Sequence, residues 1–108
     1  MLEGRERSIE AKFAHDEALR FAVQARRNKL FGLWAARRRR QSGLAAHSYA
    51  LELVADLDLH HEDALLRRVA DDLIAAGTPA PDQEIAAALR TATARAVAIV
   101  VGREEPKP

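Results

Sequence analysis

The sequence predicts an all-α protein: a four-helix bundle with a mobile N-terminal segment that can extend the first helix. Sustained apolar/polar alternation, the pattern of a strand, is missing from the sequence, and Ala, Leu, Arg and Glu, which favour helix, dominate it. Four stretches repeat their apolar residues with the 3.6-residue period of an amphipathic helix. Four such helices joined by short loops are typical of a bundle.

The first predicted helix runs from about Ser8, a plausible N-cap, to about Arg40. Gly32 falls inside it, where a glycine either bends the helix or lets a neighbour pack closely. Its apolar positions step by three, four and seven residues. We expect these side chains to face the core: Leu19, Ala22, Val23, Leu30, Leu33 and Trp34.

The second helix is predicted from about Leu44 to Asp56. A third begins near residues 58–61 and ends at Gly77, a strong C-terminal stop. The fourth starts near Asp82, after a Pro-rich linker. The expected core positions of the second helix are Ala46, Tyr49, Ala50, Leu53, Val54 and Leu57. Those of the third helix are Leu65, Leu66, Val69, Leu73 and Ala76. Those of the fourth helix are Ile85, Leu89, Ala92, Ala96 and Ile99 or Val100.

Length and composition restrict the class of protein. A chain of 108 residues forms one domain with one modest core, and the absence of Cys excludes disulfides, thiolate metal sites and a cysteine nucleophile. The sequence has no apolar run of about 18 residues, and its N-terminus does not resemble a signal peptide. We therefore expect a cytoplasmic protein with no direct membrane insertion.

Charge is distributed unevenly along the chain. Acids and bases alternate as far as Glu17, whereas residues 18–51 contain no acid and eight bases. This switch predicts a boundary between a mobile N-terminal segment (residues 1–17) and the bundle (18–102). The charged, Pro-containing residues at the end of the sequence predict a frayed C-terminal tail (103–108).

Three features of the sequence suggest other functions, namely nucleic-acid binding, metal binding or acid/base catalysis. The run from Arg37 to Arg40 is compatible with a phosphate-backbone contact, although it is also what the solvated C-terminal end of a helix carries. The cluster from His60 to Asp63 suggests a metal, but adjacent helical residues diverge by about 100°, so the polar start of a helix explains it better. For the same reason Asp16 and Glu17 do not form a general acid/base pair, and no phosphate loop or nucleophile motif appears.

Two blocks, KFAHDEALRF (residues 12–21) and ARRNKLFGLWAA (residues 25–36), resemble the signature of the ATPase inhibitor subunit zeta family of alphaproteobacteria. The preceding RERSIEAKF resembles the start typical of that family. Tyr49-Ala50, the stretch from Arg67 to Leu73 and Ala75-Ala76-Gly77 follow its pattern further downstream.

The resemblance implies a regulatory protein with no enzymatic activity and no cofactor. Such a protein inhibits ATP hydrolysis by the F-type ATP synthase, contacting the alpha, beta and central-stalk subunits of the catalytic head. Its N-terminal helix enters a catalytic alpha/beta interface and blocks rotation. Weak adenine-nucleotide binding is also implied, with no residues assigned here.

The resemblance implies that the N-terminal segment inhibits. Burial of two apolar side chains in the cleft, with charges around them that select register, then predicts nine residues for this segment: Arg5, Glu6, Arg7, Ile9, Glu10, Lys12, Phe13, Asp16 and Glu17. Ile9 stands where the family usually has Phe, and Gly4 is a poor helix former. Two alternatives stay open. One is a zeta-like bundle with weak or lost inhibition that only docks or binds nucleotide, and the other is a basic nucleic-acid-binding module.

Overall fold

The computed structural model describes the backbone of residues 2–104 and the side chains of residues 15–102. Its elements are α1 (Leu2–Arg38), α2 (Gly43–Ala55), a 3-10 helix η1 (Leu57–His60), α3 (Glu62–Ala75) and α4 (Asp82–Glu104). Residues 2–104 include no strand. The predicted all-α bundle is therefore confirmed.

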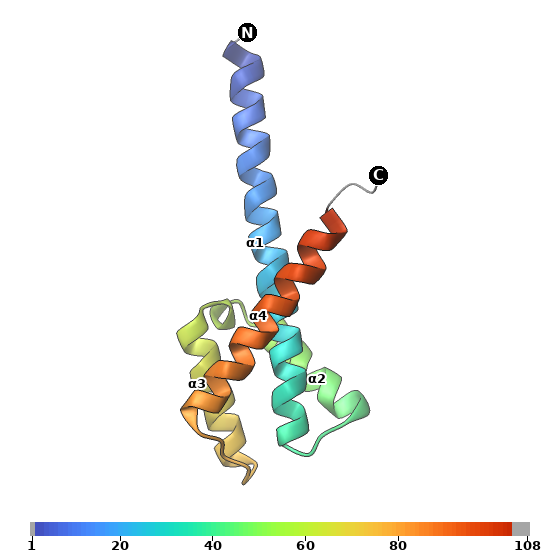
Figure 1. Ribbon diagram of the computed structural model, residues 1–108, viewed down its shortest axis with the longest axis vertical. Helices are drawn as coiled ribbons and strands as arrows, with labels where there is room; N and C mark the ends of the chain where they lie inside the picture. The colour runs from blue at the N-terminus through green and yellow to red at the C-terminus, as the bar shows by residue number, and fades with distance from the viewer. Residues whose placement is uncertain (1, 105–108) are drawn as a thin grey trace.

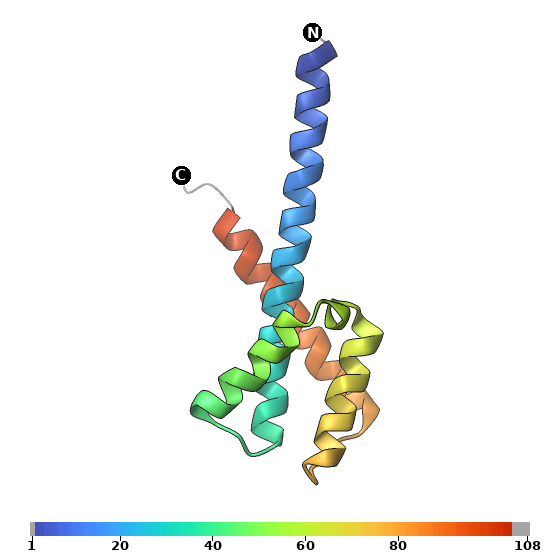
Figure 2. The ribbon, with the colours of Figure 1, turned by 180° about the vertical axis from the view of Figure 1, so that it is seen from behind.

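Helix α1 is the central helix of the molecule. It packs against both α2 and α4, while α3 lies against η1 and α4 (Figure 1). The N-terminal half of α1 continues well beyond the other helices, as the reverse view in Figure 2 also shows. The molecule is consequently elongated, with extents of 62 × 30 × 25 Å.

The start of α1 lies earlier than predicted. The helix begins at Leu2, so Ser8 is an interior residue and not its N-cap. Leu, Glu and Arg dominate residues 2–7 and are good helix formers, which explains the extension in spite of Gly4.

The end of α1 is a Schellman motif built on an arginine. Arg40 has φ +63°, in the left-handed region that favours glycine. The Gln41 N–H donates to the Ala36 carbonyl at 2.9 Å, and the Arg40 N–H donates to the Arg37 carbonyl at 3.0 Å. Gly77 fills the corresponding position after α3, with φ +75°, and confirms the predicted stop.

Gly32 is the point of closest approach between α1 and α2. A Cβ atom added to Gly32 would lie 2.8 Å from the Cα of Ala50 and 3.1 Å from its Cβ. Of the two roles considered for this glycine, close packing is the one the structure shows.

The predicted start of the third helix is split in two. The Asp58 N–H donates to the Asp56 side chain at 3.0 Å, which caps η1, and His61 is extended before α3 begins at Glu62. Since α2 already ends at Ala55, Leu57 is not part of its apolar stripe and is 64% exposed. Leu59 is buried instead.

The buried face of α1 differs from the predicted stripe. Its centre is formed by Asn28, Phe31, Gly32 and Ala35, and Phe31 is 0% exposed. The predicted Leu30, Leu33 and Trp34 are partly buried and pack on the edge of the core. The difference arises because α1 is covered from two sides, by α2 and α4, so its buried face is wider than one stripe.

The other helices follow the prediction more closely. The predicted core of α4 is confirmed by its buried residues Ile85, Leu89, Ala92, Ala96 and Val100. In α3, Leu65, Val69 and Leu73 are buried, whereas Ala76 is exposed.

Helix α4 is unusually apolar. Within residues 82–102, a window of 18 residues has a mean hydropathy of 1.5, so this helix is long and apolar enough to cross a membrane by length and composition alone. In the fold this helix packs on α1 and α3. This packing buries 28% of the apolar window.

Candidate partner-binding surface

All nine residues of the predicted inhibitory segment lie on the projecting part of α1 (Figure 1). Asp16 and Glu17 are exposed, as are the flanking His15 and Ala18, and Leu19 is the first residue of this stretch with a partly buried side chain. The other seven have side chains outside the described part of the chain: Arg5, Glu6, Arg7, Ile9, Glu10, Lys12 and Phe13.

Below the projecting part, α1 is fixed to the bundle by a buried amide. Asn28 is 0% exposed, and its Nδ2 donates to the backbone carbonyls of Leu53 and Leu59, both at 2.9 Å. These carbonyls belong to the end of α2 and to η1, where helical partners run out. Asn28 thus connects the junction of α2 and η1 to α1.

Arg27 completes this anchor. Its Nε donates to Asn28 Oδ1 at 3.0 Å, and its terminal nitrogen donates to the His60 carbonyl at 2.9 Å. Burial lowers the pKa of Arg27, and the charge of Glu62 acts in the opposite direction. The His60 ring lies 3.0 Å from the Val54 carbonyl and packs against Phe21, with ring centroids 5.2 Å apart.

A second polar network joins α2 to α3. The Tyr49 hydroxyl donates to Asp72 at 2.7 Å, and Arg68 Nε donates to the same carboxylate oxygen at 2.7 Å. Burial, followed by the hydrogen bond to Asp72 and its charge, raises the pKa of Tyr49. Arg68 also reaches Glu52 at 3.2 Å.

The arginine run 37–40 is divided among different environments. Arg38 forms an ion pair with Glu84 and lies over the Trp34 ring at 5.5 Å. Arg39 lies over the Tyr49 ring at 4.3 Å, and Arg40 closes the end of α1. The run therefore does not present four cations on one face, which weakens the phosphate-backbone reading.

The cluster from His60 to Asp63 is divided as well. His61 is the residue before α3, and Glu62 and Asp63 occupy its first turn, as predicted for a helix start. His60 departs from this prediction because it is buried in the anchor. Among the described residues, no group of three or more His, Cys, Asp or Glu is placed to hold a metal ion.

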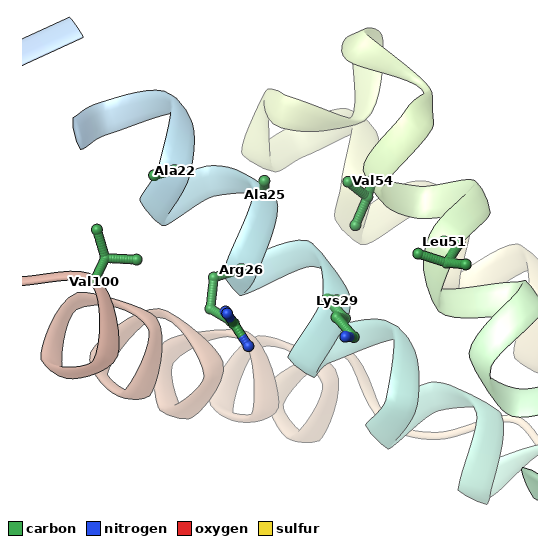
Figure 3. Close-up of a pocket in the computed structure, with 7 residues that line it drawn as sticks. All are labelled: Ala22, Ala25, Arg26, Lys29, Leu51, Val54 and Val100. Atoms are coloured by element: carbon green, nitrogen blue, oxygen red, sulfur yellow. The ribbon is translucent and has the colours of Figure 1, made fainter. Parts of the chain in front are cut away.

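A groove lies along residues 22–29 of α1, where the projecting part of this helix meets the bundle. Figure 3 shows its α1 residues between two from α2 and one from α4, and its volume is about 380 Å³. We call it the α1–α2–α4 groove, and it is lined by Ala22, Ala25, Arg26, Lys29, Leu51, Val54 and Val100.

Neither the anchor nor the groove was predictable from local sequence patterns. Arg27 and Asn28 lie in a stretch rich in basic residues, which suggests a solvated surface. The signal of burial was the position of Asn28 between Ala25 and Phe31, each three residues away on the same face of the helix. The groove combines residues from three helices, so no local pattern reports it.

The arrangement defines a small helical-bundle protein that presents one long helix beyond its core. The family model described as ATPase inhibitor subunit zeta matches residues 1–98, and the chain belongs to this family. The family is one of ATPase inhibitors, a regulatory role, and membership implies an ATP synthase as the binding partner. No curated protein and no solved structure matches the chain.

Proposed function

We propose that this protein inhibits ATP hydrolysis by the F-type ATP synthase by inserting the N-terminal part of α1 at a catalytic alpha/beta interface, beside the central stalk. The observation that carries the proposal is the extension of α1 beyond the bundle (Figure 1). Residues 2–18 of a helix span about 25 Å. That length is enough to enter a cleft between two subunits while the bundle stays outside.

Insertion requires apolar anchors and charges that fix their register. Ile9 and Phe13 are four residues apart, so a helix brings their positions to one face. Burial of two such side chains contributes about 1.5–3 kcal/mol each. The surrounding charges, at Arg5, Glu6, Arg7, Glu10, Lys12, Asp16 and Glu17, then select orientation by complementarity.

This mechanism needs a steric block and no chemistry. It places the protein in the cytoplasm, peripheral to the inner membrane through the synthase. Weak adenine-nucleotide binding belongs to the same proposal, with no residues assigned to it.

The test is a titration of the cognate ATPase with the full chain and with Ile9→Ala and Phe13→Ala. Each substitution should raise the half-inhibitory concentration tenfold or more, because truncating a buried interface anchor costs about 2 kcal/mol. Ile74→Ala is the matched control, since Ile74 is 64% exposed at the C-terminal end of α3. Phe31→Ala is unsuitable as a control because Phe31 is fully buried. Equal inhibition by all four proteins would contradict the proposal.

The nucleic-acid alternative is separated by a salt titration. A phosphate-binding protein loses duplex affinity steeply with added salt. Duplex binding of that kind, together with no capture of ATP synthase subunits, would replace the inhibitor proposal.

A further inference from the structure

The α1–α2–α4 groove has the shape of a helix-binding site. Its floor is formed on α1 by Ala22 and Ala25, which have the smallest side chains that line it. Larger apolar side chains rise on either side, Leu51 and Val54 from α2 and Val100 from α4 (Figure 3). A low floor between two apolar ridges accepts the apolar face of an amphipathic helix.

The groove keeps apolar surface in contact with solvent. Leu51 is 55% exposed although it borders Val54 in the same groove. Burial of such surface by a partner is favourable at about 25 cal/mol per Å². Val54 is partly buried and Val100 is only 8% exposed, so Leu51 is the larger apolar side chain of the groove that gains most from being covered.

The charges of the groove have one sign. Arg26 and Lys29 line it, and the sequence from residue 18 to residue 51 contains no acid. Both side chains are half-buried. Long basic side chains at such positions typically pack their stems on apolar surface and keep their charged ends in water. Among the described side chains, the ion pairs involve other bases, Arg38 and Arg68. A complementary partner helix carries carboxylates along its edge.

The groove is also continuous with the inhibitory segment. Ala22 follows Glu17 by five residues, a distance of about 7.5 Å along a helix. A protein that encloses α1 as far as Glu17 therefore brings its own surface to the mouth of the groove.

We infer that the α1–α2–α4 groove docks an amphipathic helix with an acidic edge, on the rim of the ATPase cleft that receives α1. This inference rests on the proposed function and adds a second contact to it. The N-terminal segment blocks the enzyme, and the groove holds the bundle against its outer surface.

The groove is tested by reversing its charges in the full chain. The double variant Arg26→Glu/Lys29→Glu should raise the half-inhibitory concentration about tenfold or more, while inhibition at saturation stays complete. Arg37→Glu/Arg90→Glu is the matched control, because it makes the same change in net charge at exposed positions away from the groove. Unchanged circular dichroism and melting temperature establish that each variant is folded.

A second variant tests the shape of the groove without changing its charge. Ala22→Gln places a longer side chain on the floor, in a residue type that suits a helix. It should weaken inhibition in the same direction. Inhibition at the control's concentration by both the charge and the shape variants would overturn the inference.

Direct binding to the immobilised ATPase separates this inference from the proposed function. The full chain carrying Ile9→Ala and Phe13→Ala should lose inhibition yet retain binding, and adding Arg26→Glu/Lys29→Glu should remove that binding. If the Ile9/Phe13 variant does not bind, the groove is no docking site and the insertion proposal stands. If it inhibits fully, the insertion proposal fails.

Other occupants of the groove would be recognised in the same experiments. A dimer in sedimentation equilibrium that dissociates on Arg26→Glu/Lys29→Glu assigns the groove to a second copy and overturns the inference. ATP binding that depends on Arg26 and Lys29, with ATPase binding unaffected, overturns it as well.

Discussion

At the scale of single residues, two polar side chains connect the helices: Asn28 links α1 to α2 and η1, and Tyr49 links α2 to α3. Asn28 donates two hydrogen bonds to backbone carbonyls from separate elements, and Tyr49 donates one to Asp72 across helices. Both are buried, where an unpaired polar group costs far more than it does in water. These contacts are therefore sensitive points of the fold.

Asn28→Ala should lower the free energy of unfolding by about 2–3 kcal/mol, because it leaves the Leu53 and Leu59 carbonyls without this donor. Urea denaturation followed by circular dichroism measures the change. Gln83→Ala, at an exposed position of α4, should stay within about 0.5 kcal/mol of the parent. A similarly small effect of Asn28→Ala would show that the anchor contributes little.

The arginine run gives a pair of opposite predictions. Arg40→Gly should stabilise the protein by about 0.5–1 kcal/mol, because Arg40 occupies the left-handed region. Arg37→Gly, in the last turn of the same helix, should destabilise it by about 1 kcal/mol through lost helix propensity. Chemical denaturation of the two variants checks the signs, and the same sign for both would contradict the account of how α1 ends.

The raised pKa of Tyr49 predicts a loss of stability in alkali. Below about pH 10 the phenol is protonated in both the folded and the unfolded chain, so its contribution is fully present. Above that pH the unfolded chain releases the proton first, and stability falls by about 1.4 kcal/mol per pH unit. Tyr49→Phe should cost about 1 kcal/mol at pH 7. The gap between parent and variant should then narrow above pH 10, and a constant gap up to pH 11 would be incompatible with this assignment.

At the scale of elements, the contact between α1 and α2 depends on the missing side chain of Gly32. Gly32→Ala improves helix propensity by about 1 kcal/mol, yet overpacking a contact typically costs about 1–3 kcal/mol. The added Cβ would lie 2.8 Å from backbone, which cannot rotate away. We expect net destabilisation in thermal or urea unfolding, whereas Gly102→Ala, with open space around it, should be neutral or mildly stabilising. Stabilisation by Gly32→Ala would show that the two helices separate easily.

Helix type and order were predictable from local information. The 3.6-residue period defines α2, α3 and α4, and Gly77 marks the end of α3. The buried face of α1 was not predictable in the same way. Phe31 and Asn28 are buried because both α2 and α4 cover α1. The spacing of apolar residues predicts a single buried face and does not show that two helices pack against it.

The candidate site was also predictable only in part. The residues proposed to inhibit were predicted from the family resemblance and from the apolar and charged side chains of the N-terminal segment, and they lie on the projecting part of α1. The groove was missed because Ala22, Leu51 and Val100 are far apart in the sequence. Their proximity depends on the crossing of α1 with α2 and α4.

At the scale of the whole molecule, the fold separates two tasks. The bundle holds the C-terminal half of α1 through the buried anchor at Arg27 and Asn28. The upper half extends away from it (Figure 2). The proposed steric block requires this arrangement of a packed base and a projecting helix.

The most direct measurement of this account is a titration of the cognate ATPase with the full chain and with a chain lacking residues 1–13. Circular dichroism and thermal melting of the shortened chain provide the control for folding. We expect the shortened chain to keep a cooperative helical bundle and to lose inhibition of ATP hydrolysis. Inhibition by the shortened chain at the same concentrations as the full chain would contradict it.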